Sequence, residues 1–285
     1  MQHFPFGELL KKAWKTTFFN MKLWWLALFA GGGAYSGMNY DPSSSFQGTN
    51  GEQLMSSIQK IPSGIWIVIG IAVALLVLVL MFVSIVCQTG LIKGVDLANK
   101  GEKTDLWPMI KFGAKKFPHV LLLGLMMFVI VAPLLVLMLL GAWMSNLWIF
   151  IPGILLLIIV GVAMALFLFY SLYYVVLRDE KVLTAMSKSV DLFRKNWIIT
   201  VVMFMIVWGI SMAYMFGAMI AAFILVIPGA LLVAGVAFLS KIAAIVLGVI
   251  GGIIMAVIIM ALSAGYTTFL FSFYVSVFNK LEEAK

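Results

Sequence analysis

The stretch that decides the fold is KVLTAMSKSVDLFRKNWIITVVMFM, residues 181–205, in which a short amphipathic segment runs directly into a long apolar one. Apolar residues in its first half recur at steps of three and four, which places them on one face of a helix. They are Leu183, Met186, Val190, Phe193 and Trp197. The other face carries Lys181, Ser187, Lys188, Asp191, Arg194 and Lys195. A basic amphipathic helix of this kind is typical of the membrane interface. We expect it to lie among lipid headgroups before the chain enters the bilayer at Asn196.

The composition excludes an ordinary soluble domain. Of the 285 residues, 64% are apolar and 11% are charged, whereas charged residues make up about a quarter of soluble domains. Four long runs contain no Asp, Glu, Lys or Arg: Ile61–Ile92, Phe117–Leu177, Asn196–Ser240 and Ile242–Asn279. Since about 20 apolar residues cross a bilayer, we predict an all-α transmembrane protein, with residues 1–285 forming one polytopic domain.

Six membrane spans are predicted within and beside these runs. They are Phe18–Tyr35, Ile65–Cys87, Pro118–Met138, Ile149–Tyr170, Asn196–Phe216 and the segment from Lys241 to Asn279. The short apolar piece Pro228–Ser240 is expected to lie at the interface or to re-enter the membrane from the outer side. If it instead formed a span with Lys241, the chain would cross seven times and end outside. A rival interpretation of the first span is a signal peptide with the core Leu23–Phe29.

Two earlier stretches repeat the design of residues 181–205. In Phe6–Met21, an apolar face opposes Lys11, Lys12 and Lys15. In the basic segment Lys93–Lys116, Asp105 is placed to cap a helix that presents Lys111 and Lys115 on its polar side. The sequence therefore predicts three amphipathic interfacial helices on the cytoplasmic side.

The distribution of basic residues predicts the orientation. With six spans and a cytoplasmic N-terminus, seventeen of the nineteen Lys and Arg residues fall on the cytoplasmic side, and only Lys60 and Lys241 fall outside. Cytoplasmic segments of membrane proteins carry this excess of positive charge. We therefore expect a multi-pass protein of the cytoplasmic membrane with both termini in the cytoplasm.

The three amphipathic segments divide the chain into similar units. Residues 1–92, 93–177 and 178–285 each contain a basic helix, a span, an outer segment and a second span. Because each unit has two spans, the three would be parallel repeats. Gene duplication would produce this pattern, and so would the positive-inside rule acting alone.

Two stretches carry a resemblance to a known family. LLKKAWKTTFFNMKLWWLALFAGG (9–32) and VVLRDEKVLTAMSKSVDLFRKNW (175–197) resemble the bacterial and archaeal six-span proteins that carry the glycerophosphodiester phosphodiesterase membrane domain. In that family the hydrolase, where present, is a separate soluble domain. The resemblance implies a membrane domain here and carries no phosphodiesterase activity with it.

The sequence offers little catalytic chemistry. A single cysteine, Cys87, and two histidines cannot form a conventional zinc site, and no metal or cofactor is expected. No charged residue lies in the middle of a predicted span, where an ionisable group would mark a functional site. Hydroxyl residues in the spans, among them Thr200, Ser211, Tyr266 and Thr268, are expected to bond the backbone of the preceding turn or a neighbouring helix.

The basic helices are the one feature that stands out. A Lys or Arg near anionic lipid contributes about 1 kcal/mol, so the three helices are predicted to contact lipid headgroups, unless they serve only to fix the topology. The predicted contact residues are Lys11, Lys12, Lys15, Lys111, Lys115, Lys116, Lys188, Arg194 and Lys195.

The leading functional hypothesis is a non-enzymatic scaffold or accessory membrane protein that contacts anionic lipid. The alternative is a small-molecule or lipid transporter with a path between the repeats, and an intramembrane enzyme that acts on lipid is a weaker third. Membrane lipids are the expected partners, with a protein partner or a homo-oligomer left open. The net charge of +8 is explained by cytoplasmic bases, so no nucleic acid is expected.

Overall fold

A computed structural model shows an all-helical protein and describes residues 4–32, 63–144, 147–237 and 240–283, within which there is no strand. The helices are α1 (Phe6–Phe19), α2 (Lys22–Ala27), the π-helix η1 (Leu28–Gly32), α6 (Ser63–Asn99), α7 (Leu106–Trp143), α8 (Leu147–Phe167), α9 (Ser171–Leu177), α10 (Val182–Lys195), α11 (Trp197–Ala237) and α12 (Lys241–Glu283). The predicted all-α class is therefore confirmed.

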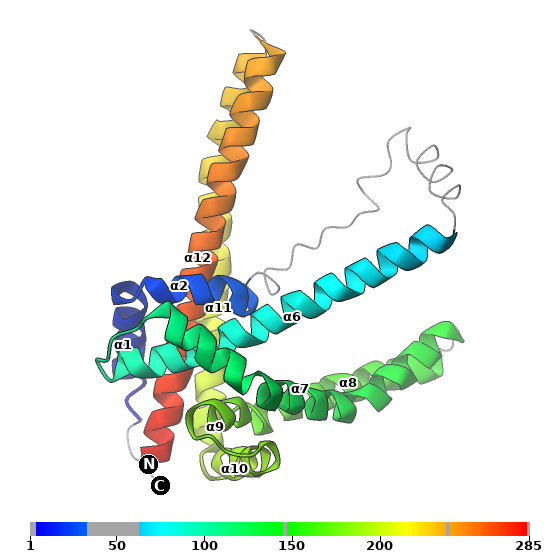
Figure 1. Ribbon diagram of the computed structural model, residues 1–285, viewed down its shortest axis with the longest axis vertical. Helices are drawn as coiled ribbons and strands as arrows, with labels where there is room; N and C mark the ends of the chain where they lie inside the picture. The colour runs from blue at the N-terminus through cyan, green and yellow to red at the C-terminus, as the bar shows by residue number, and fades with distance from the viewer. Residues whose placement is uncertain (1–3, 33–62, 145–146, 238–239, 284–285) are drawn as a thin grey trace.

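The helices form a body from which three arms extend (Figure 1). One arm is α6, the second is the antiparallel pair α7 and α8, and the third is the antiparallel pair α11 and α12. The body contains the short helices α1, α2, η1, α9 and α10, together with the ends of α6 and α12 and the starts of α7 and α11. Helix α1 packs along the last turns of α12, so the first and last helices lie side by side.

The hydrophobic core lies in the body. Leu23, Leu91, Leu192, Met203 and Phe273 are each fully buried there and come from five different helices. The arms, by contrast, expose their apolar side chains almost everywhere: Leu78 in α6 is 61% exposed and Ile224 in α11 is 65% exposed. In water such surfaces would be strongly unfavourable, whereas lipid tails are as apolar as the side chains themselves.

The lengths of the arms fit a bilayer. At 1.5 Å per residue, the roughly 23 residues of α12 between Lys241 and the body span about 34 Å, close to the roughly 30 Å of hydrocarbon in a membrane. Among the described residues, five helical segments are long and apolar enough to cross a membrane: Ile65–Asn99, Leu106–Trp143, Phe150–Leu177, Trp197–Ala237 and Lys241–Glu283. The protein is therefore a membrane protein with several apolar spanning helices.

The first predicted span, Phe18–Tyr35, does not form one long helix in the described residues. The chain there ends α1, turns at Asn20 and Met21, and continues as α2 and η1 up to Gly32. Residues 33–35 of the prediction lie outside the described ranges. Leu23 and Leu26, in the alternative signal-peptide core, are buried in the body.

The prediction for Pro228–Ser240 was wrong. Pro228 lies inside α11, which continues without a break to Ala237, so residues 228–237 do not form a separate piece. Residues 238 and 239 of the prediction lie outside the described ranges. A proline removes one backbone donor. In an apolar environment, however, helix is the only local structure that satisfies the remaining backbone groups, so spanning helices tolerate proline.

Two of the three predicted amphipathic helices are separate elements, and one is not. Helices α1 and α10 are short, as predicted. The segment after Asp105 is instead the first turns of the 38-residue α7. The basic segment that contains it is also mostly helical, because α6 continues to Asn99 with Leu91, Ile92 and Val95 buried on one face. Asp105 has the extended backbone of an N-cap, but its side chain makes no capping bond.

Glycines bring α6 and α7 into close backbone contact. A Cβ atom added to Gly90 would lie 2.9 Å from the carbonyl oxygen of Met109, and one added to Gly113 would overlap the carbonyl oxygen of Val86. Gly94 is closely packed as well, because an added Cβ atom would lie 2.6 Å from Met109 Sδ and 2.7 Å from Leu23 Cδ2. Gly252 in α12, by contrast, has no described atom within 4 Å of an added Cβ atom.

Candidate functional site

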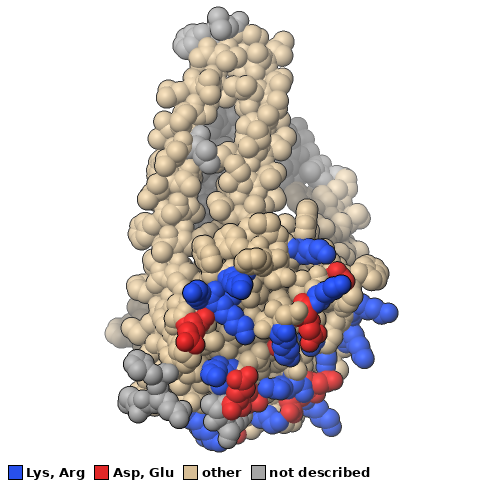
Figure 2. Space-filling model, turned by 90° about the vertical axis from the view of Figure 1, so that its left-hand side faces the viewer, with Lys and Arg blue, Asp and Glu red and all other residues tan. Residues whose placement is uncertain are grey.

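The charged side chains gather at one end of the molecule. Sixteen of the seventeen described Lys and Arg residues lie in the body, and only Lys241 lies at the tip of an arm. Figure 2 shows this on one face, where bases and acids cover the lower part, while no charged side chain is seen on the α11–α12 arm above it. The body therefore presents the polar surface of the protein, and the arms present the apolar one.

All nine predicted headgroup residues lie in the body, on α1, α7 and α10. Seven of them are exposed and form no ion pair with a described residue: Lys11, Lys12, Lys15, Lys111, Lys115, Arg194 and Lys195. These seven side chains are free to bind an anion. The other two, Lys116 and Lys188, have partners within the chain.

Lys116 holds the turn between α9 and α10. Its side chain is only 9% exposed, and its ammonium group pairs with the carboxylate of Asp179, which is 81% exposed. Asp179 has a left-handed backbone, with φ at 56°, which Asp adopts more readily than most residues. The hydrogen bond and the charge of Lys116 lower the pKa of Asp179. Lys116 therefore ties α7 to this turn and is poorly placed to meet a lipid.

Helix α10 is fastened to the end of α8. Lys188 pairs with Glu180, and the Ser189 hydroxyl accepts from the Tyr170 amide at 3.1 Å while donating to the Phe167 carbonyl at 2.8 Å. Val182, Ala185 and Leu192 are buried. Leu183, on the predicted apolar stripe, is instead 68% exposed. The face that packs on the protein is thus Val182–Ala185–Ser189–Leu192. The predicted stripe lies beside it and is only partly covered, since Phe193 is buried while Leu183 is exposed.

A polar network that was not predicted joins α1, α6 and α12. Asp96, whose side chain is 6% exposed, accepts from Asn279 Nδ2 at 2.9 Å and lies 2.8 Å from Lys100 Nζ and 3.8 Å from Lys93 Nζ. Three carboxylate contacts satisfy this buried charge, as such a group requires.

The network continues one turn further along α6. The Thr16 hydroxyl donates to Asn99 Oδ1 at 2.9 Å, and Asn99 Nδ2 donates to the Ser276 hydroxyl at 3.1 Å. Helix α6 therefore holds both the first and the last helix of the chain. The signal in the sequence is the spacing of Lys93, Asp96 and Lys100 at three and four residues, which brings the three side chains together on one face of a helix.

The end of α12 is tied to α9 in a similar way. The Tyr174 hydroxyl donates to the Glu282 carboxylate, which also lies 3.9 Å from Arg178 Nε. These contacts and the Asp96 network connect α1, α6, α9 and α12 within the body through hydrogen bonds and ion pairs.

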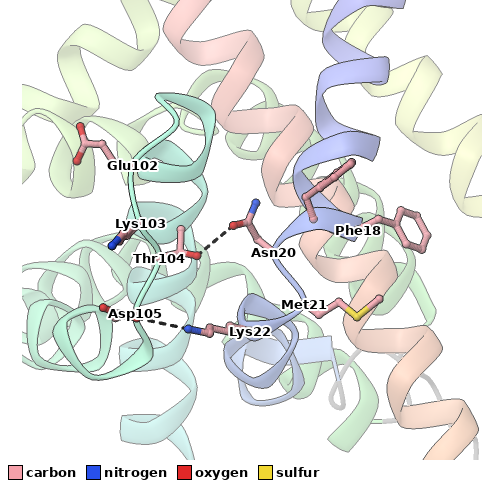
Figure 3. A pocket seen from close by; sticks show the side chains of 9 residues that line it. Phe18, Asn20, Met21, Lys22, Glu102, Lys103, Thr104 and Asp105 are labelled. Carbon is pink, nitrogen blue, oxygen red and sulfur yellow. Dashed lines mark hydrogen bonds and ion pairs between the residues drawn. The ribbon is translucent and has the colours of Figure 1, made fainter.

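A polar cleft of about 510 Å³ lies between the α1–α2 junction and the loop that joins α6 to α7 (Figure 3). Thr104 donates to Asn20 Oδ1 at 3.1 Å, and Lys22 lies 3.5 Å from Asp105. Glu102 and Lys103 complete its charges. Two bases and two acids cancel, so this cleft does not by itself select an anion.

A second cavity, of about 460 Å³, is apolar and lies where the α11–α12 arm leaves the body. Trp14, Phe18 and Trp24 line one side of it, and Tyr214 and Tyr266 line the other. The two tyrosine rings stack at 4.1 Å between centroids, and the Tyr266 hydroxyl lies 2.6 Å from the Ser211 hydroxyl.

The hydroxyl residues of the spans behave largely as predicted. Thr200, Ser211 and Thr268 each donate to the carbonyl of the residue four positions earlier, at 2.8–3.1 Å. Thr200 also bonds the Tyr170 hydroxyl at 3.0 Å, which links α11 to the start of α9. These hydroxyls therefore bond within helices and, at Thr200, between helices.

No group of three or more His, Cys, Asp or Glu side chains in the described part of the chain could hold a metal ion. Cys87 is a buried free thiol. What the body can do chemically is therefore to bind anions through exposed Lys and Arg and to hold apolar groups in the cavity beside α1. Comparison with protein families, with curated proteins and with solved structures finds no match to this chain.

Proposed function

We propose that this protein is a non-enzymatic scaffold or accessory protein of the cytoplasmic membrane, which contacts anionic lipid through the exposed bases of its body. The observation that carries the proposal is the separation of charge: seven unpaired bases lie at one end of arms that are apolar over about one bilayer thickness. Each such base near an anionic leaflet contributes about 1 kcal/mol. Protein partners, among them a second copy of the chain, would join it in the membrane.

The positions of the first and last helices support six spans with both termini on the same side of the membrane. Helix α1 and the end of α12 pack together in the body, which supports placing both of them on the same side of the membrane. A chain with that arrangement would cross the membrane an even number of times between them. Helices α6, α7, α8, α11 and α12 supply five crossings, and a sixth would have to lie between α1 and α6. The contact of η1 with α6 would fit a sixth span that pairs with α6, which would give three parallel units of two spans each.

The positive-inside rule assigns the body to the cytoplasm. The test is cysteine labelling in a Cys87→Ala background, with single cysteines introduced at Lys111, Lys195 and Lys241. A membrane-impermeant maleimide should label position 241 in intact cells. It should label positions 111 and 195 only after the cells are permeabilised. Labelling of positions 111 and 195 on opposite sides would overturn the architecture on which the proposal depends.

Lipid preference is tested by the lipid that co-purifies with the protein. Replacing Lys111, Lys115, Arg194 and Lys195 by Gln should lower the ratio of anionic to zwitterionic phospholipid bound. Replacing Lys241, at the opposite end, should leave that ratio unchanged and serves as the matched control. An unchanged ratio in the fourfold variant would refute the headgroup contact.

Lipid translocation is the second candidate, and the apolar cavity at the root of the α11–α12 arm favours it over transport of water-soluble molecules. In proteoliposomes, a scaffold should not accelerate the movement of fluorescent phospholipid between leaflets. Acceleration by the wild-type protein would decide for translocation.

A further inference from the structure

We propose that the apolar cavity between α1, α2, α11 and α12 is a specific lipid site, which holds one acyl chain of an amphiphile whose anionic head binds Lys11 and Lys15. The inference deepens the proposed function and depends on it for the headgroup, because it names one lipid position within a broader basic surface.

The cavity wall is suited to hydrocarbon. Its volume of about 460 Å³ lies in the range of roughly 300–1,000 Å³ that is usual for small-molecule sites. Its aromatic lining comes from both sides, with Trp14, Phe18 and Trp24 facing Tyr214 and Tyr266.

Two of the polar side chains that line the cavity, Trp24 and Tyr266, bond within the protein. Trp24 Nε1 donates to the Thr17 carbonyl at 3.0 Å, and the Tyr266 and Ser211 hydroxyls bond each other at 2.6 Å. An occupant is therefore recognised by burial of apolar surface, at about 0.8 kcal/mol per CH₂ group, and not by hydrogen bonds from these atoms.

The position of the cavity fits a membrane lipid. Ile210, Ala213, Ala261 and Leu262 contribute to its wall, and all four lie in the two helices that are apolar enough to span the membrane. The cavity therefore lies where hydrocarbon begins, directly beside the charged body.

Charge on α1 defines the head of the occupant. Lys11, Trp14, Lys15 and Phe18 follow one another at steps of three, one and three, so they share one face of the helix. Trp14 and Phe18 line the cavity, and their rings lie 4.6 Å apart. Both lysines are exposed without an ion pair in the described chain, and Lys15 Nζ lies 5.6 Å from the Phe19 ring. An acyl chain in the cavity thus places an anionic head, phosphate or carboxylate, beside two unpaired ammonium groups.

The experiment uses the full-length protein in nanodiscs that contain a photoreactive lipid with a diazirine in the acyl chain. Three probes are compared: phosphatidylglycerol, phosphatidylcholine and palmitate. Mass spectrometry should locate cross-links to α1–α2 and to the α11–α12 segments around Tyr214 and Tyr266. The expected order has phosphatidylglycerol or palmitate above phosphatidylcholine, and the stronger of the two anionic probes identifies the head as phosphate or carboxylate. Equal labelling by phosphatidylcholine would overturn the assigned head.

Filling the cavity provides the decisive variant. Ala261→Trp, in α12, should abolish cross-links to α1–α2, and Ala213→Leu, in α11, should reduce them because it fills less of the cavity. Ala256→Trp, on the same exposed helix but outside the wall, is the matched control and should label as the wild type does. Undiminished labelling in both filled variants would refute the site.

The two proposals fail separately. Lys11→Gln with Lys15→Gln should lower labelling by the anionic probe to the level of phosphatidylcholine. One outcome separates them: the fourfold variant that includes Lys111 and Lys115 leaves the ratio of anionic to zwitterionic lipid unchanged, while the Lys11 and Lys15 replacements still lower labelling by the anionic probe. That result refutes headgroup contact by the broad basic surface and leaves the cavity site standing.

Discussion

Replacement of Gly113 by Ala tests the close approach of α6 and α7. A Cβ atom at this position would overlap the Val86 carbonyl oxygen and would lie 3.0 Å and 3.2 Å from the Val86 carbonyl carbon and Cα. These are backbone atoms inside α6, so a change of side-chain rotamer cannot relieve the overlap. Helices α6 and α7 would have to move apart.

The magnitude follows from a matched control in the same helix. Gly124, also in α7, has no atom within 4 Å of its added Cβ. Both replacements gain the same helix propensity, up to about 1 kcal/mol, so the difference between them isolates the overlap. Overpacking costs about 1–3 kcal/mol, and a gap of 0.5–1 Å alone forfeits about a quarter to a half of the dispersion energy at the contact. Gly113→Ala should therefore be about 1–3 kcal/mol less stable than Gly124→Ala.

The assay is equilibrium unfolding in mixed micelles, followed by tryptophan fluorescence. The expected difference corresponds to about 5- to 150-fold in the unfolding constant. Gly90→Ala should show the same sign, because its Cβ would lie 2.9 Å from the Met109 carbonyl oxygen. If Gly113→Ala matches Gly124→Ala in stability, α6 and α7 do not approach as described.

Three further predictions concern the body. Asp179→Asn should lower the midpoint of thermal unfolding more than Lys116→Met does. It leaves the 9%-exposed ammonium of Lys116 without its counter-charge, whereas Lys116→Met leaves only an exposed carboxylate in water. The reverse order of the two midpoints in a thermal scan would contradict this pairing. The pKa of Asp179 is lowered in the folded protein. The ionised Asp179 side chain therefore stabilises the fold above pH 3.8, its ordinary pKa, and this stabilisation is lost as the pH falls below 3.8. Thermal unfolding measured over a pH series should show this loss in the wild type and not in Asp179→Asn. Asp96→Ala should lower the free energy of unfolding by about 1–3 kcal/mol because the Asn279 amide loses its buried acceptor. As a control, Ala at the exposed Asp191 should change that free energy by no more than about 0.5 kcal/mol. Equal unfolding midpoints in the two variants would show that the Asp96 network does not hold α6 to α12.

The sequence decided the features that depend on local composition. Uncharged runs of more than 30 residues require apolar surroundings, so the helical class and the membrane character followed from composition alone. The spacing of apolar and basic residues in Phe6–Met21 and in Lys181–Lys195 located α1 and α10, because helical periodicity is a local property. It also located the exposed bases, since charged residues without partners remain on the surface.

Tertiary structure decided which face of each helix is buried and where each long helix stops. Leu183 and Ala185 differ in burial because packing on α9, and not hydrophobicity, selects the face of α10. The extension of α6 to Asn99 and the pairing of Asp96 with Asn279, 183 positions away, depend on contacts between distant segments. Lys116 resembles its neighbour Lys115 in the sequence, yet only one of them is buried against Asp179. Such choices are set by the neighbours that folding brings together, and no local pattern contains them.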